Sequence, residues 1–286
     1  MKGWIIKNGF LDTPKMLEPI QQLMDSAQRK REQLIVKDNS ELLPILSGKG
    51  IELNERLPDY VIFWDKDIRL AKSLELMGIR LFNSSKAIEI CDDKSLMYQT
   101  LAKHGFEIPL TVVSPKTYDG FGYSEQFIKR ILSKFPFPFI AKDCFGSFGE
   151  QVHLIERKED LEEVLKSSRP MVFQEFIETS KGRDVRIQVV GGKAVAAMYR
   201  ESSGDFRANA SLGAKIRSYS PSAEEAELAV NVAEKLGLDF AGVDLLFGKN
   251  GPVVCEVNSN AHMKNLMDCT GVNAADAIIE HIRGTL

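Results

Sequence analysis

The chain has 286 residues, 44% of them hydrophobic and 27% charged, which is ordinary for a globular protein with more than one packed core. Its net charge of −3 and the lack of an apolar run near the roughly 20 residues of a membrane helix argue against nucleic-acid and membrane partners. Because the N-terminus has no signal-peptide pattern and the four cysteines have no zinc spacing, we expect a cytoplasmic protein with free thiols.

The first third of the chain alternates short apolar runs with helical patterns. We expect strands at 3–8, 33–37, 59–65 and 79–83, and helices at 14–30 and 67–78. Alternation of strand and helix is typical of a parallel sheet with helices on its faces. The sequence therefore predicts a small α/β domain over residues 1–85.

The rest of the chain has strands that carry polar residues at regular offsets. We expect helices at 84–105, 158–168 and 221–237, and strands within 107–115, 136–156, 171–177, 185–200, 240–248 and 251–258. Segment 185–200 is predicted to be a β-hairpin, because Gly191 and Gly192 lie between two apolar runs and can take the positive φ of a tight turn. The chemistry should lie in this part of the chain.

A carboxylate within an apolar strand, Glu256, is the first sign of a functional site. The two last strands are joined by a short loop ending in Gly251, and this spacing predicts a hairpin with Asp244 opposite Glu256 and Asn258 on the same face. The other face would carry Val243, Leu245, Val253, Cys255 and Val257. Two facing carboxylates repel each other unless a cation lies between them, and hard oxygen ligands suit Mg²⁺ bound to nucleotide phosphates. A protonated carboxyl, or an ion pair with Lys or Arg, is the alternative.

Two further features fit a phosphate site. The loop from Gly146 to Gly149 has backbone N–H groups that could cover phosphates, although such a loop is more often a simple turn. Lys142 projects from an apolar strand, where its charge needs an anion. Arg200 and Arg207 are expected to stabilise anionic oxygens of a reacting group, although a solvated hairpin face would look similar.

Four stretches, in their order and spacing, resemble the ATP-grasp superfamily and, within it, the RimK-type ligases that join a carboxylate to an amine. They are QEFIETSKGRDVR (174–186), GDFRANASLG (204–213), LDFAGVDLLFGKNGPVVCEVNSN (238–260) and GVNAADAIIEHI (271–282). The resemblance implies an α/β chain, α+β in its catalytic part, with the ATP-grasp fold. Two α+β subdomains, 86–170 and 171–286, would hold the nucleotide after the N-terminal domain 1–85.

The resemblance also implies roles for residues of this chain. The nucleotide contacts would be Lys94, Lys142, Gly146, Ser147, Gly149, Glu175, Phe176, Ile177, Asp184, Arg207 and Asn209. Mg²⁺ or Mn²⁺, expected as two ions, would be held by Asp244, Glu256 and Asn258. The catalytic arginines would be Arg200 and Arg207, and the residues that border the substrate would be Arg186, Asn260, His262 and Lys264. For His262 and Lys264 the alternative is that they only hold the loop.

The implied reaction starts with attack of a substrate carboxylate on the γ-phosphate of ATP, after which an amine attacks the acyl phosphate. Its partners would be a small carboxylate and an amine acceptor, which could be an amino acid, a peptide or a protein terminus, and a homo-oligomer is common in the family. Bulky Phe145 and Phe148 and the segment 259–265 depart from the family pattern, so the substrate itself is not implied. A kinase acting on a small acceptor and a non-catalytic ATP-binding module are the alternatives.

Overall fold

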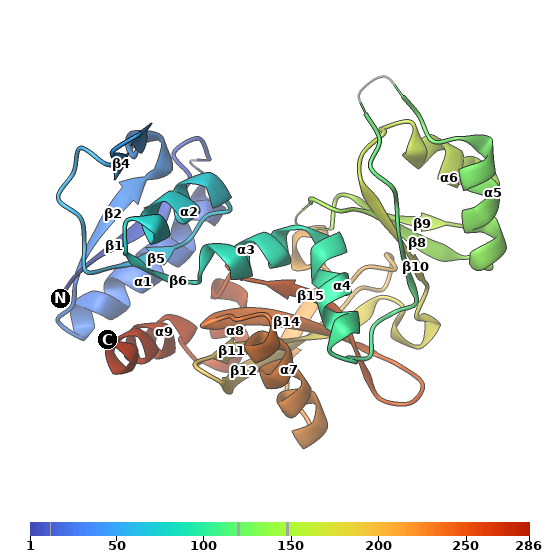
Figure 1. The fold of residues 1–286 in the computed structure, drawn as a ribbon. Coiled ribbons are helices and arrows are strands. Elements are labelled where there is room, and N and C mark those ends of the chain that lie inside the picture. Colours follow the sequence, from blue (N-terminus) through green and yellow to red (C-terminus); the bar gives the residue numbers. More distant parts are fainter. Residues whose placement is uncertain (12, 119–120, 147–148) are drawn as a thin grey trace.

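The computed structural model describes residues 1–11, 13–118, 121–146 and 149–286. Figure 1 shows three groups of strands: a blue N-terminal sheet at one end, a green and yellow sheet at the other, and the orange to red C-terminal strands between them. Helices α3 (Ser85–Asp92) and α4 (Lys94–Lys103) connect the first group to the other two.

The N-terminal sheet is parallel, as the strand–helix alternation predicts, with strand order β2-β1-β5-β6. Its elements are β1 (Lys2–Lys7), α1 (Pro14–Arg29), β2 (Gln33–Asp38), β5 (Tyr60–Phe63), α2 (Ile68–Leu76) and β6 (Arg80–Phe82). Ile5 packs on one face with α1, and Trp4 and Ile6 pack on the other with α2. Both faces are therefore buried, which explains why these strands read as continuous apolar runs. A 3₁₀ turn (Asn39–Glu41) and a small hairpin of β3 (Ile45–Ser47) and β4 (Gly50–Glu52) lie between β2 and β5.

The second sheet is antiparallel and has the order β7-β10-β8-β9. Its elements are β7 (Thr111–Val113), α5 (Glu125–Lys134), β8 (Phe139–Asp143), β9 (Val152–Ile155), α6 (Lys158–Leu165) and β10 (Met171–Glu175). Helix α5 was not predicted, although its signals are present: the Ser124 side chain accepts a hydrogen bond from the Phe127 N–H, and Ile128 and Ile131 face the core.

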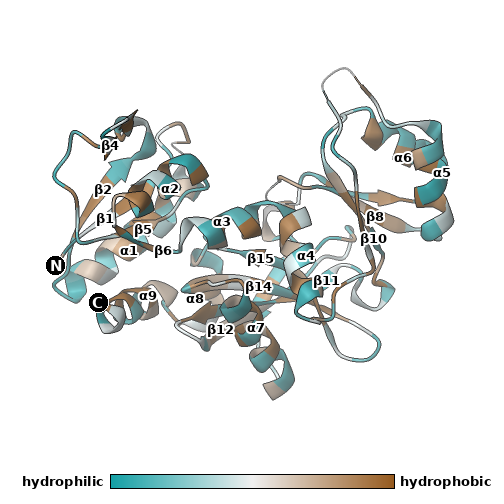
Figure 2. Cartoon of the chain, viewed as in Figure 1, coloured by the Kyte–Doolittle hydropathy of each residue, from teal (hydrophilic) through white to brown (hydrophobic). Residues whose placement is uncertain are grey.

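The third sheet is antiparallel and has the order β13-β12-β11-β14-β15. Its strands are β11 (Arg183–Val190), β12 (Lys193–Glu201), β13 (Lys215–Ser218), β14 (Phe240–Phe247) and β15 (Pro252–Asn258), with 3₁₀ turns at Glu178–Ser180 and Ala210–Leu212. One face packs against α3, α4 and α7 (Ala223–Lys235), and the other packs against α8 (Lys264–Thr270) and α9 (Ala274–Thr285). Figure 2 shows hydrophobic residues concentrated along these strands. Within the described residues, we find no helix with the length and apolar character needed to span a bilayer.

The β14–β15 hairpin confirms one prediction and corrects another. Asp244 does lie opposite Glu256, but Leu245 pairs with Val254, so Cys255 is the extra residue of a β-bulge. Val254 therefore faces the core together with Val257, whereas Cys255 lines a pocket beside Glu256. The prediction that Cys255 and Val253 share a face with Leu245 and Val257 was wrong, because a bulge reverses the alternation of side chains beyond it.

Asn83 joins the N-terminal sheet to the C-terminal sheet. Its Nδ2 donates to the carbonyl oxygens of Phe240 at 2.9 Å and Ser259 at 2.8 Å. Its Oδ1 accepts from the backbone N–H groups of Asp239 at 2.6 Å and Phe240 at 3.2 Å. The side chain is fully buried, so these bonds fix the position of β14 relative to β6.

Candidate active site

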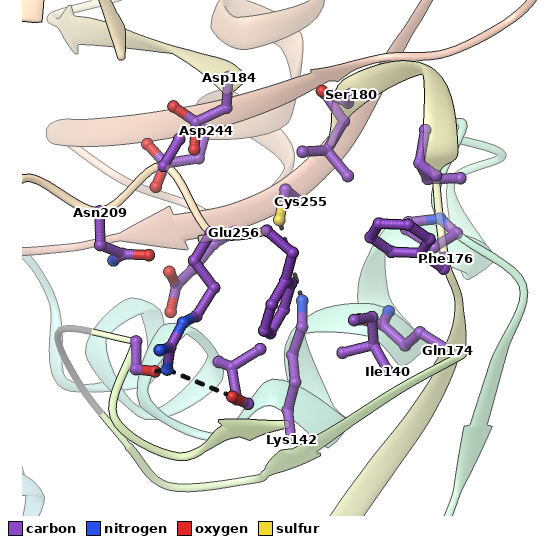
Figure 3. Close-up of a pocket in the computed structure, with 18 of the residues that line it drawn as sticks. Ile140, Lys142, Gln174, Phe176, Ser180, Asp184, Asn209, Asp244, Cys255 and Glu256 are labelled. Atoms are coloured by element: carbon purple, nitrogen blue, oxygen red, sulfur yellow. Dashed lines mark hydrogen bonds between the residues drawn. The ribbon is translucent and has the colours of Figure 1, made fainter. Parts of the chain in front are cut away.

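A cleft of about 910 Å³ lies between the β8–β9 hairpin and the third sheet. Figure 3 shows Lys142 and Gln174 on one side of it and Asp184 and Asp244 on the other. It is lined by ten of the predicted nucleotide contacts: Lys94, Lys142, Gly146, Gly149, Glu175, Phe176, Ile177, Asp184, Arg207 and Asn209. Ser147, the other predicted contact, lies outside the described residues.

Lys142 stands on β8 and points into this cleft toward Cys255, as Figure 3 shows. Its Nζ lies 3.4 Å from the Tyr98 hydroxyl and 3.8 Å from the Cys255 Sγ. Burial alone would lower the pKa of Lys142, but Cys255, Tyr98 and Glu256 raise it. Burial also raises the pKa of Tyr98 to about 12 and that of Cys255, so both groups are neutral at pH 7. A protonated Lys142 is thus held in the cleft, where an anion would stabilise it.

The phosphate loop is held from two sides. Lys94 Nζ donates to the Gly146 carbonyl at 3.1 Å, and Arg207 Nη1 donates to the Gly149 carbonyl at 2.6 Å. Asp205 forms an ion pair with Arg207 and orients it, and this contact lowers the pKa of Asp205. Gly149 has φ +78°, and a Cβ there would lie 2.8 Å from the Asn209 Oδ1, so this position requires glycine.

The carboxylates of Asp244 and Glu256 are paired with basic side chains, which is the alternative that the sequence left open. Lys94 Nζ lies 3.3 Å from the Glu256 Oε1. Arg186 and Arg200 both bind Asp244. Burial would raise the pKa of Asp244, but the two arginines lower it below its ordinary value. Charge pairing therefore explains how two facing carboxylates coexist in this hairpin.

The same residues also fit a divalent cation. Asp244 and Glu256 offer facing carboxylate oxygens, and the buried Asn258 Nδ2 has no hydrogen-bond partner in the described parts of the chain. An amide whose nitrogen has no partner can turn its oxygen toward a cation. Among the described residues, no three or more His, Cys, Asp or Glu side chains gather as a metal site. Two carboxylates and one amide, completed by phosphate oxygens, nevertheless suit Mg²⁺, so the three metal ligands remain a prediction.

A second pocket, with an empty volume of about 1810 Å³, lies between the N-terminal sheet and the third sheet. It is lined by all the predicted substrate residues: Arg186, Asn260, His262 and Lys264. Burial, together with the charges of Lys15 and Arg186, lowers the pKa of His262 to about 4, so its imidazole is neutral at pH 7. Arg200, Asn209 and Glu256 line both pockets. The two pockets therefore adjoin at these three residues.

Several lining residues were missed from the sequence. In the second pocket, Asn8 follows β1, and Trp64 and Asp65 follow β5. Ligands bind at the carboxyl ends of strands in open parallel sheets, and that rule could have found them. In the first cleft, Gln174 is buried, with an Oε1 that has no partner among the described residues. Gln174 lies in a strand that is mostly apolar, and nothing in that pattern indicates a functional role for it.

This chain is similar to known proteins in family, in sequence and in fold. Residues 91–282 match the family model of the RimK-like ATP-grasp domain. The chain is 36% identical to a "Probable alpha-L-glutamate ligase" of Coxiella burnetii over 74% of this chain and 70% of that protein. It is 37% identical to human "Beta-citrylglutamate synthase B" over 72% of this chain and 53% of that protein. The structure of the VanG D-Ala:D-Ser ligase of Enterococcus faecalis has the same fold, with a TM-score of 0.77, 18% identity and coverage of 100% and 99% of the two chains.

Proposed function

The chain belongs to the RimK-like ATP-grasp family of ligases, and from that premise we propose that it joins a small carboxylate to an amine through an acyl phosphate, with release of ADP and phosphate. One observation carries this proposal: Arg200, Asn209 and Glu256 line the nucleotide cleft and the second pocket at once. A carboxylate held in the second pocket would meet the γ-phosphate at this wall. Attack at phosphorus requires such a direct approach of the two groups.

The charged and polar side chains around the two pockets have proposed roles. Lys94, Lys142 and Arg207 bind phosphate oxygens, and Arg200 stabilises the charge that develops on the transferred group. Asp244, Glu256 and Asn258 would hold Mg²⁺ or Mn²⁺, expected as two ions, and the cation would neutralise phosphate charge. Arg200 and Arg207 are thus the proposed catalytic residues.

The second pocket supports the choice of substrate class. Arg186 and Lys264 are cationic and suit a carboxylate donor, while the neutral His262 can accept a hydrogen bond from an amine. The acceptor would be an amino acid, a peptide or a protein terminus. We further propose the three-part division at residues 85 and 170, and a homo-oligomeric assembly.

Hydroxylamine trapping tests the chemistry. The protein would be incubated with Mg-ATP, hydroxylamine and a pool of amino acids and small carboxylic acids, followed by measurement of ADP, AMP, phosphate and hydroxamate. We expect hydroxamate to form in the same amounts as ADP and phosphate. The variant Glu256→Gln should form no hydroxamate, whereas the control Glu162→Gln, which alters an exposed carboxylate on α6, should still form it. AMP as product would contradict the mechanism. ADP with a phosphorylated acceptor would indicate a kinase, and binding of ATP without turnover would indicate a binding module.

A further inference from the structure

Asp244, one of the proposed metal ligands, has both carboxylate oxygens occupied by arginines. Arg186 donates from Nε to Oδ1 at 2.6 Å and from Nη2 to Oδ2 at 2.7 Å. Arg200 donates from Nη2 to Oδ2 at 2.9 Å. A cation that takes Asp244 as a ligand must therefore compete with a guanidinium for the same lone pairs.

The two arginines differ in what else holds them. Arg200 also makes a bidentate contact with Asp184, at 2.6 and 2.7 Å, and only 3% of its side chain is exposed. For Arg186 the described residues offer Asp244 as its one carboxylate partner, and 13% of its side chain is exposed. Displacement of Arg200 would leave Asp184 without its partner, whereas displacement of Arg186 leaves no other carboxylate unpaired. Arg186 is therefore the arginine that gives way at lower free-energy cost.

The surroundings of Arg186 decide where its guanidinium would go. Its stem is packed on one side, because a Cβ added to Gly242 would lie 3.4 Å from the Arg186 Cδ and 2.6 Å from the Ala261 Cβ. The same side chain lines the second pocket, where the donor carboxylate is proposed to bind. A rotation about its last torsions would thus be enough to bring the guanidinium from Asp244 into that pocket.

We propose that Arg186 and the divalent cation compete for Asp244, and that Arg186, once released, binds the carboxylate of the donor in the second pocket. This rests on the proposed ligase function and adds a link between its two pockets. A guanidinium can bind either Asp244 or the donor, because its two parallel N–H groups form a bidentate contact with any carboxylate.

The exchange makes binding of the cation and of the donor cooperative. Release of Arg186 by the cation supplies the donor with a charged partner, and a donor that holds Arg186 frees Asp244 for the cation. Such coupling is reciprocal by thermodynamic necessity. The donor is then bound well only when the cation and its nucleotide are in place, which avoids an unproductive complex.

Metal binding tests the competition without any knowledge of the substrate. Mn²⁺ would be titrated into the full-length protein saturated with ADP, with free Mn²⁺ followed by its electron paramagnetic resonance signal. Loss of the competitor in Arg186→Met should tighten Mn²⁺ binding by about fivefold or more. Arg186→Lys keeps the charge but cannot bridge both oxygens, so it should also tighten binding, by a smaller factor. If charge alone mattered, the lysine variant would match the wild type.

Arginine NMR observes the release directly. The Arg186 Nε–H signal of the ADP-saturated, ¹⁵N-arginine-labelled protein, assigned by its loss in Arg186→Lys, should broaden or shift on addition of Mg²⁺. The Arg200 signal should persist as an internal reference. Mn²⁺ binding that is unchanged or weaker in both variants, or an unchanged Arg186 signal, would overturn the exchange and leave the ligase proposal intact. Failure of every variant to bind Mn²⁺ would overturn both.

Discussion

Lys142 shows at the scale of one residue how a buried charge is kept for a ligand. Its side chain is 8% exposed, and Cys255 and Tyr98, the groups within hydrogen-bonding range, are neutral at pH 7. The ammonium thus lacks a close carboxylate among the described residues, and the more distant Glu256, which raises the pKa of Lys142, offsets part of the cost of burial. A nucleotide phosphate would supply a closer anionic partner.

We therefore expect opposite effects on binding and on stability for Lys142→Met. Nucleotide affinity should fall by about tenfold or more, because a charge-assisted contact to phosphate is lost. The free energy of unfolding should stay the same or rise, because an apolar chain of similar length replaces a buried charge. Titration with a fluorescent ADP analogue and urea denaturation measure the two quantities. Equal losses in both would show that Lys142 is structural.

His262 should make stability depend on pH. Its pKa is about 4 in the folded protein and 6.5 in its ordinary state. Between these values the unfolded chain holds a proton that the folded chain does not, so stability rises with pH across this window and is lost as pH falls from 6.5 toward 4.

Replacement of this histidine tests the assignment. Urea denaturation of His262→Gln from pH 7 to pH 4 should show a shallower loss of stability than the wild type, because no imidazole remains to be protonated on unfolding. The control His104→Gln removes an exposed histidine at the end of α4 and should leave the slope unchanged. A steeper slope for His262→Gln would contradict the lowered pKa.

At the scale of elements, Asn83 links two sheets through four hydrogen bonds. In Asn83→Ala, two buried carbonyl oxygens, the buried Phe240 N–H and the half-buried Asp239 N–H lose their partner. We expect a loss of about 4 kcal/mol or more in the free energy of unfolding, because each of these four polar groups costs about 1–3 kcal/mol when it is left unsatisfied. Denaturation measured beside Asn250→Ala, in the exposed β14–β15 loop, provides the comparison. A loss below about 1 kcal/mol, the net value of one ordinary hydrogen bond, would show that water replaces the amide.

The accuracy with which the sequence predicts the structure also differs from one element to another. The apolar runs of β1 and β5 and the glycine pair between β11 and β12 gave correct strands, because burial and turn geometry leave local patterns. The bulge at Cys255 could not be predicted, since an extra residue in a strand has no signature of its own in the sequence. The ion pairs of Asp244 depend on β11 lying beside β14, a long-range pairing that spacing alone does not give.

At the scale of the whole molecule, the nucleotide cleft takes its lining from two sheets. Lys142 and Glu175 come from the second sheet, and Asp244 and Glu256 come from the third. A bound nucleotide would therefore hold these two sheets together. Its effect should appear in the stability of the entire chain.

We expect Mg²⁺ with ADP to raise the melting temperature and EDTA to reverse most of that rise. Saturation at 100 times Kd should add about 2.7 kcal/mol to the free energy of unfolding. Scanning calorimetry of the wild type and of Glu256→Gln measures this effect, and the variant should lose the part that depends on Mg²⁺. An equal rise with and without the cation would argue against the proposed metal ligands.

The N-terminal part of the chain, as far as the structure describes it, contributes to the lining of one pocket and not of the other. No described residue before Lys94 lines the nucleotide cleft, whereas Lys7, Asn8, Trp64 and Asp65 line the second pocket. Variation at these four residues would therefore change the second pocket and leave the lining of the proposed nucleotide cleft unchanged. Descendants of one ancestral ligase could acquire new substrates by exchanging the segment that carries them, and hybrids that carry a relative's N-terminal segment offer a practical way to retrace that history.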